Sequence, residues 1–384
     1  MDPQTVLDNV RQVSDRFAAD RKERQLRRHL DPSDFAQLAA AGFLLTGVPA
    51  ARGGLWLSVR ESTRPLCEVL RVLARGDSSV ALVSSMHPAV LSFWLASPRT
   101  DLDHQAAWEE QTAWLADTAL DGAWWGTITS EPGSGGDIAR TKAVARRDGA
   151  DGAYRLSGAK HFGSGSGITS YMMTTALPEG EREPDLFFMD VRGVPWDGSA
   201  GVKLVAEWDG QGMTATQSHA MQFEDFPATR CAWPGNLAGL AAAAGPFVAC
   251  SFTAVIVGIV ESAIETARRQ LTPRHDALRP YEQVEWTRAE LEAWLVRQAF
   301  EGMLRAVEEE RDPRWSVLQG KTAIAELAES LLARVCKVVG GGTFNRTSPF
   351  AFWYEDVRAL GFLRPPWGLA FDQLFALSTI HSPA

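Results

Sequence analysis

Two turns rich in glycine and serine carry the residues of this sequence that are best suited to contact a ligand. Residues 129–136 read TSEPGSGG, and residues 163–167 read GSGSG. Glycines at this density let the backbone approach a bound molecule and present its N–H groups, and the hydroxyls between them add further hydrogen-bonding groups. The stretch between the turns alternates as β-strands do. We therefore expect a ligand site here, with two flexible surface loops as the alternative.

The charged and metal-ligating residues argue against several other kinds of chemistry. The 384 residues carry a net charge of −9, so no nucleic-acid partner is expected. The seven histidines show no HxH or HxxxH spacing, and no metal site is predicted. The four cysteines form no CxxC pair, which favours reduced thiols in a cytosolic protein: Cys67, Cys231, Cys250 and Cys336.

No membrane span or leader is expected either. The longest apolar run, residues 239–258, is interrupted by Pro246, Ser251 and Thr253, and we interpret it as a buried helix. The first thirty residues are polar and helical rather than charged and then apolar. A cytoplasmic location is the resulting expectation.

The hydrophobic patterning divides the chain into three parts of an α+β fold. Residues 1–120 have helical periodicity and form an N-terminal helical domain. Residues 121–236 hold short strand-like runs without helices between them, and a DGADG turn at 148–152 predicts a hairpin, so an antiparallel β-barrel or sandwich is expected. In residues 237–384 the helical pattern returns as a C-terminal four-helix bundle, with helices expected at 246–271, 281–310, 315–339 and 367–377.

Four stretches in this order resemble motifs of the acyl-CoA dehydrogenase superfamily of flavoproteins. They are AGFL at 41–44 with VP and GG after it, TSEPGSGGD at 129–137, YRLSGAK at 154–160, and VGGGTF at 339–344 with DVR at 356–358. Each motif alone is weak, but four at family spacing are specific, and the resemblance covers essentially the whole chain. It implies a β domain on one face of a flavin ring, C-terminal helices on the other, and a homodimer or homotetramer.

The resemblance also implies which residues contact the flavin ring. Its edge and pyrimidine side would face three hydroxyl residues, Thr127, Thr129 and Ser130. Phe162 takes the place of an aromatic wall, and Ser164 that of a hydroxyl near the reactive N5. A flavin needs hydrogen bonds at its polar edge and an apolar wall against its ring, which agrees with these residue types.

The rest of the cofactor would lie farther out. Gly135 and Gly136 would lie beside the ribityl-phosphate part or at the substrate mouth, and Gly341 near the adenosine end if the cofactor is FAD. The family's R..FG motif is missing at residues 274–280, where Arg274 or Arg279 is a candidate to replace its charge. The resemblance implies FAD as the cofactor, and the missing motif makes FMN the alternative.

The catalytic position departs from the family pattern. Dehydrogenases of this superfamily use a carboxylate base about eight residues after the Asp of the DVR segment, and that position is Arg364 here. The minority location, residues 247–250, holds no Asp or Glu, and the nearest carboxylate to the usual position is Glu355. Arginine keeps its proton throughout the working range and cannot act as a base.

At these positions the sequence resembles the flavin-dependent monooxygenases that share this fold. Residues 208–219, WDGQGMTATQSH, resemble a stretch of that branch, whose members bind reduced flavin, add O₂ and pass one oxygen atom to substrate. Such an enzyme needs no carboxylate base but profits from a polar donor near the flavin. His87 is the candidate for that catalytic role, with a hydrogen-bonded structural histidine as the alternative.

Three functions follow from these observations. The first is oxidation of an acyl thioester or related small molecule by hydride transfer to FAD. The second is a reduced-flavin-dependent monooxygenase, and the third is a catalytically silent partner subunit. In each case we expect Glu131 to fix its loop, and Asp356 and Arg358 to form a buried structural pair.

Overall fold

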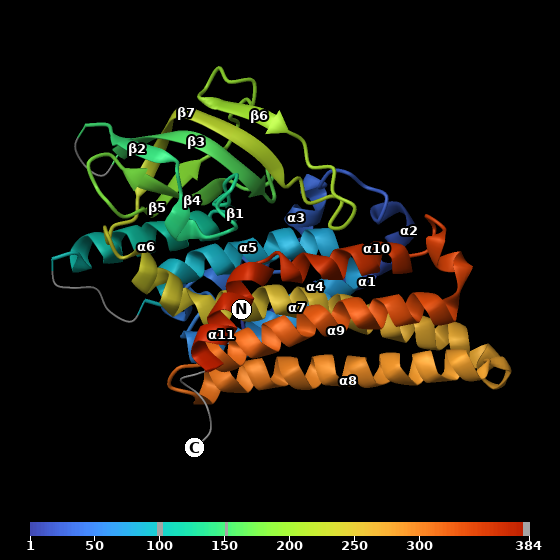
Figure 1. Cartoon of the computed structure of the whole chain (residues 1–384). Helices are drawn as coiled ribbons and strands as arrows, with labels where there is room; N and C mark the ends of the chain where they lie inside the picture. Colours follow the sequence, from blue (N-terminus) through green and yellow to red (C-terminus); the bar gives the residue numbers. More distant parts are fainter. Residues whose placement is uncertain (98–102, 150–152, 379–384) are drawn as a thin grey trace.

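A computed structural model describes residues 1–97, 103–149 and 153–378. It has helical N- and C-terminal parts with a β domain between them, as expected from the patterning (Figure 1). The β domain lies over one side of the helices, with α5 directly beneath it. The DG turn expected at 148–152 lies partly outside the described residues, but the strands on either side of it pair antiparallel.

The N-terminal helices begin where polar caps precede apolar repeats. Ser58 caps α4 through the backbone N–H of Glu61, and Asp77 caps α5 through that of Val80. Pro88 lies within α5, which continues through it. The helices of this part are α1 (Pro3–Ala19), α2 (Arg21–Arg24), α3 (Pro32–Ala40), α4 (Val59–Gly76), α5 (Ser78–Leu95) and α6 (Gln105–Leu120).

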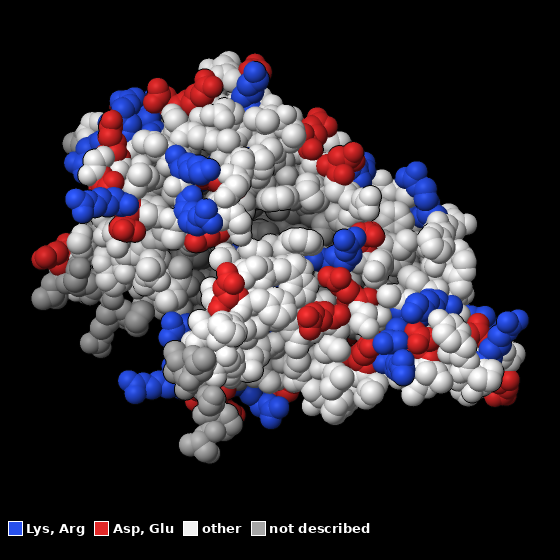
Figure 2. Space-filling model, viewed as in Figure 1, with Lys and Arg blue, Asp and Glu red and all other residues white. Residues whose placement is uncertain are grey.

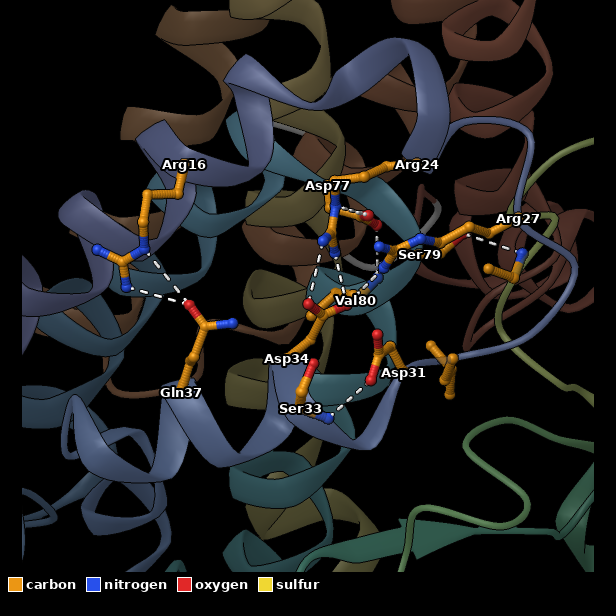
Figure 3. A network of polar contacts seen from close by, with 12 residues as sticks. Arg16, Arg24, Arg27, Asp31, Ser33, Asp34, Gln37, Asp77, Ser79 and Val80 are labelled. Carbon is orange, nitrogen blue, oxygen red and sulfur yellow. Dashed lines mark hydrogen bonds and ion pairs between the residues drawn. The ribbon is translucent and has the colours of Figure 1, made fainter.

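A buried polar network joins three of these helices (Figure 3). Arg24 of α2 donates two hydrogen bonds, of 3.0 and 2.7 Å, to the carboxylate of Asp34 on α3. Its Nε donates to the cap residue Asp77 at 2.8 Å, so one guanidinium holds both the α3 carboxylate and the N-terminus of α5. Because all of its partners are charged, this network positions α5 beneath the β domain more specifically than apolar packing alone.

The β domain is one seven-stranded sheet. Strand β4 pairs with β1, β2 and β5, β3 pairs with β2 and β7, and β7 also pairs with β5 and β6. The expectation of a purely antiparallel domain is wrong for two pairs, since β4 runs parallel to β1 and β2. The long connection between β1 and β4 makes that parallel pairing feasible. The strands are β1 (Trp125–Thr127), β2 (Val144–Arg147), β3 (Ala153–Gly163), β4 (Tyr171–Pro178), β5 (Asp185–Asp190), β6 (Val202–Ala206) and β7 (His219–Arg230).

Up to residue 378, where the described part of the chain ends, the C-terminal part has three long α-helices and two short ones. The first, α7, begins at Leu237, nine residues before the expected Pro246, and α10 was not among the expected helices. Helix α8 exposes large apolar side chains such as Val284, Leu291 and Trp294, and a homo-oligomer stays a prediction. The helices are α7 (Leu237–Leu271), α8 (Pro280–Glu309), α9 (Arg314–Val339), α10 (Phe350–Val357) and α11 (Trp367–Ser378).

Two helices are long and apolar enough to cross a membrane by length and composition. They are α5 and the segment of α7 with the short 3-10 helix that follows it. Within their most apolar windows, 83% and 94% of the residues are buried inside the protein. Core helices of soluble proteins pass the same test, so this finding is weak evidence for a membrane span.

Candidate active site

A cavity of about 820 Å³ lies between the β domain and the helices. Leu82 and Met86 of α5 and Val248 and Phe252 of α7 give it an apolar floor. Its roof is formed by the turns of the β domain, and residues 355–366 close one side. Figure 2 shows this face hollowed between the β domain and the helices, with mostly uncharged side chains around the opening. The volume falls in the range of sites that bind small molecules and cofactors.

The turn at 129–136 is held in place by a buried ion pair. Glu131 accepts hydrogen bonds from Lys160 Nζ at 2.5 Å and from the backbone N–H groups of Lys142 and Ala143 at 2.5 and 3.2 Å. Burial opposes ionisation of this carboxyl, but the hydrogen bonds from Lys160, Thr141 and Lys142 N together with the Lys160 charge outweigh it and lower its pKa. Lys160 is fully buried on β3 and also donates to the carbonyl of Thr175 at 2.6 Å. Glu131 therefore fixes its loop, as the sequence predicts.

A chain of hydroxyls reaches the cavity at Ser164. Thr216 Oγ1 donates to the carbonyl of Met213 at 2.9 Å, and a hydroxyl has only one proton to donate. Ser218 must therefore donate to Thr216 at 2.7 Å, and Ser164 to Ser218 at 2.8 Å. The lone pairs of Ser164, which lines the cavity, remain as acceptors for a ligand N–H.

The other predicted β-domain residues also line the cavity. Thr127, Thr129, Ser130, Gly135 and Gly136 all do so. The hydroxyl of Thr127 donates to the carbonyl of Met173 at 3.1 Å. The hydroxyl of Ser130 has no hydrogen-bond partner within the described part of the chain, so it is available to a ligand.

Two aromatic rings stand at the mouth of the cavity. Phe162 is 57% exposed and has a φ of 57°, in the left-handed region that a bulky residue rarely adopts. Its ring lies edge-on to Trp208, with 6.1 Å between the centroids. The strained backbone at Phe162 keeps its apolar side chain exposed to solvent. Such strain is typical of residues that contact a ligand.

Arg364 enters the cavity from the segment that links α10 to α11. Its Nη1 donates to the carbonyl of Gly136 at 2.9 Å and its Nη2 donates to the hydroxyl of Thr129. Burial lowers the pKa of this guanidinium to about 10, so it remains protonated at neutral pH. A Cβ on Gly136, whose φ is 81°, would lie 2.8 Å from Pro366, so only glycine permits this close approach.

The expected pairing of Asp356 with Arg358 is wrong. Arg358 pairs with Glu355 at 2.7 Å, because the two side chains project from neighbouring turns at the end of α10 and line the cavity together. Asp356 points the other way, where it accepts a hydrogen bond from Met213 N at 2.6 Å and another from the hydroxyl of Ser78. It thereby joins α5, α10 and the loop at 208–218.

His87 does not line the cavity, so the structure does not place it for the expected catalytic role. It is fully buried, and its Nδ1 accepts from Trp125 N–H at 3.2 Å. Its Nε2 must then donate to the carbonyl of Leu44, 3.0 Å away. Burial lowers its pKa to about 4, so the ring is neutral and both nitrogens are used by the backbone. These contacts fit the structural alternative for His87.

Arg274 and Gly341 do not reach the cavity either. Arg274 follows α7, where its guanidinium donates to the carbonyl of Val338 at 2.8 Å, close to Gly341. The cavity is lined by Val248, and the helix from Val248 to Leu271 is about 35 Å long at 1.5 Å per residue. The two residues therefore lie together at the far end of the C-terminal helices.

Two polar or aromatic residues of the cavity, His161 and Trp208, were given no role from the sequence. His161 lines it beside Phe162, and its ring makes no hydrogen bond in the part of the chain that is described. Trp208 donates its indole N–H to Met213 O at 2.9 Å and presents its ring to Phe162. The alternation along β3 was the available signal for His161, because Lys160 before it points into the core.

Comparison with known proteins agrees with the fold. Residues 126–226 match the family model described as acyl-CoA dehydrogenase, middle domain. This match confirms the resemblance to the acyl-CoA dehydrogenase superfamily over these residues.

Relatives come from both branches. YdbM of Bacillus subtilis (strain 168), named as an acyl-CoA dehydrogenase, is 22% identical over 98% of this chain and 97% of its own length. The dibenzothiophene monooxygenase of Mycolicibacterium goodii is 29% identical over 60% of this chain, and the match spans 54% of that relative. The structure of FMN-bound TdsC from Paenibacillus sp. A11-2 superposes with a TM-score of 0.80 at 18% identity, over 99% of this chain and 98% of that one. That likeness shows the fold.

Proposed function

We propose that the protein is a reduced-flavin-dependent monooxygenase that binds FMN and a small organic substrate in the cavity. The observation that carries this proposal is the occupation of the usual base position by Arg364, beside an intact set of hydroxyl and aromatic groups for a flavin. The named monooxygenases among its relatives support it, as does the FMN held by TdsC. The name of YdbM supports the primary expectation, oxidation of an acyl thioester with FAD as cofactor, but Arg364 stands where that reaction would need a carboxylate.

The residues present fit a flavin ring. The Phe162 side chain offers an apolar wall, and Ser130 offers an unpaired hydroxyl for a polar edge. Ser164 is a hydrogen-bond acceptor because its proton is used on Ser218. An acceptor suits the N5–H group that a reduced flavin carries and an oxidised one lacks. When bound, reduced FMN would supply the electrons that activate O₂.

The protein's own part in such a reaction is to orient the two molecules and exclude water. The apolar residues of α5 and α7 desolvate the site, which strengthens the few hydrogen bonds within it. The two carboxylates that line the cavity are both paired, Glu131 with Lys160 and Glu355 with Arg358. Neither is placed as an unpaired base for removing a substrate proton, which a dehydrogenase would need.

Anaerobic and aerobic experiments with flavin-loaded protein test the proposal. The protein is reconstituted with FMN and titrated anaerobically with butyryl-CoA, octanoyl-CoA and palmitoyl-CoA while the flavin absorbance is followed. We expect no bleaching. Reduced FMN is then bound and mixed with O₂, and we expect the protein to slow its reoxidation relative to free reduced FMN.

Two results would overturn the proposal. Bleaching by an acyl-CoA would establish a dehydrogenase, and its loss in Glu355→Gln but not in Asp372→Asn would identify Glu355 as the base. Failure of the protein to bind either FMN or FAD would instead leave the silent partner subunit. Asp372 is an exposed carboxylate on α11, so its variant controls for the loss of one negative charge.

A further inference from the structure

The cavity contains one cation that no carboxylate neutralises. Glu131 is paired with Lys160 and Glu355 with Arg358, so these four charges cancel in pairs. Within residues 1–97, 103–149 and 153–378, Arg364 forms no ion pair. Asp137 acts on it only through space and does not line the cavity. The cavity therefore has an excess positive charge located at Arg364.

The hydrogen bonds of Arg364 leave much of its guanidinium unused. A guanidinium has five N–H donors, and the structure uses one on the carbonyl of Gly136 and one on the hydroxyl of Thr129. Both acceptors are neutral. Burying a cation among apolar walls costs free energy unless an anion or further hydrogen-bond acceptors compensate its charge. The unused N–H donors and the positive charge of Arg364 are therefore available to bind an anion.

The guanidinium is also held in position before any ligand arrives. Lys321, which is almost fully buried on α9, donates from Nζ to the carbonyl of Pro365 at 2.7 Å. On the other side, Pro366 packs against Gly136, the residue whose carbonyl Arg364 contacts. The segment is thus fixed on both sides, which reduces the ordering cost of binding.

We propose that Arg364 binds the anionic group of the substrate, a carboxylate or similar small oxyanion attached to an apolar body. The charge selects the anion, and the apolar floor formed by residues such as Met86 and Phe252 receives the rest of the molecule. This inference names the substrate class of the same cavity and rests on the proposed function for the statement that the ligand is a substrate. The other anion that could reach Arg364 is the phosphate of FMN.

Equilibrium binding with a matched set of probes tests the inference. Hexanoate, hexanesulfonate and hexanamide are titrated into oxidised, FMN-loaded protein by calorimetry, using wild type, Arg364→Gln, Arg364→Lys and Arg358→Gln. We expect wild type to bind both anions more tightly than hexanamide, and Arg364→Gln to weaken them by roughly tenfold to hundredfold, as for loss of a charge-assisted hydrogen bond. Arg364→Lys should recover part of the loss. Arg358→Gln, made together with Glu355→Gln so that no bare carboxylate is left in the cavity, should weaken them by less than about threefold, because the charges of that pair cancel.

Comparison of FMN with riboflavin separates the two sources of the anion. If Arg364 held the cofactor phosphate, Arg364→Gln would weaken FMN but not riboflavin, and the proposal would be wrong. Equal binding of hexanoate and hexanamide by wild type, or an unchanged preference in Arg364→Gln, would also overturn it. Circular dichroism and the melting temperature establish that each variant is folded. If wild type binds no flavin, the proposed function fails, and the same titrations on the flavin-free protein still decide the role of Arg364.

Discussion

Asp356 should make the stability of this protein fall as the pH rises through the range in which most carboxyl groups ionise. Burial, opposed by hydrogen bonds from Ser78 and Met213, raises the pKa of Asp356 from 3.8 to about 6, and the nearby charges of Asp77 and Glu355 add to the rise. Below about pH 4 this carboxyl is protonated in both the folded and the unfolded chain. Between pH 4 and 6 only the folded chain keeps the proton, so ionisation increasingly favours unfolding.

The size of the effect follows from the shift. A rise of about two pKa units corresponds to roughly 3 kcal/mol of folding free energy, and above pH 6 the whole cost is present. Asp356→Asn removes the ionisation while keeping the geometry. The amide oxygen still accepts from Met213 N, and the amide nitrogen donates to the hydroxyl of Ser78, which then acts as the acceptor.

The assay is denaturant unfolding of wild type and Asp356→Asn at several pH values from 4 to 8. We expect the difference in unfolding free energy, variant minus wild type, to increase by about 3 kcal/mol from pH 4 to pH 7 and then to level off. Asp372→Asn, an exposed carboxylate on α11, is the matched control and should show no such increase. A difference that stays flat or decreases over this range would refute the reasoning about Asp356.

Three further outcomes are expected. Lys160→Met should lower the unfolding free energy by about 3–5 kcal/mol, because it leaves the carboxylate of Glu131 buried without its cation, and Lys160→Met with Glu131→Gln should recover part of it in the same denaturant-unfolding assay. His87→Leu should cost about 2–4 kcal/mol by orphaning two backbone groups, yet leave FMN affinity unchanged in a fluorescence titration. The difference in unfolding free energy, variant minus wild type, should also increase as the pH falls from 6.5 toward 4, because the variant lacks the cost of keeping His87 neutral. Ser164→Ala should weaken reduced FMN about fivefold more than oxidised FMN, seen as a lower midpoint potential of the bound flavin, and equal effects on both forms would contradict the assigned direction of its hydrogen bond.

The fold was predictable where the sequence pattern repeats over many residues. The apolar periodicity of α8, α9 and α11 placed their ends within one residue, and Pro280 at the start of α8 and Gly340 after α9 mark two of those ends. Strand β1 has three residues and β6 five, too few for alternation to stand out. The parallel pairing of β4 with β1 depends on contacts across more than forty residues, which no local pattern encodes.

The site was predictable where it is made of one continuous stretch. The turns at 129–136 and 163–167 were identified from their glycines and hydroxyls, and they do form the roof of the cavity. His161 and Trp208 were missed because their roles depend on which way a side chain faces and on a neighbour distant in the sequence. The catalytic role predicted for His87 is not supported by its position in the structure. A histidine on an apolar helix has the right chemistry, but only the packing shows that backbone groups use both of its nitrogens.

Arg364 shows how one substitution changes what a shared scaffold is suited to do. A carboxylate at this position would receive a proton from the substrate and would repel an anion. A guanidinium cannot receive a proton, and it attracts the anion instead. The surrounding structure accommodates the change, since the carbonyl of Gly136 and the hydroxyl of Thr129 both accept hydrogen bonds from the cation. Because Ser130, Phe162 and Ser164, the groups proposed to face the flavin, need no such change, the proposed enzyme would keep its cofactor while exchanging proton abstraction for recognition of a charged substrate.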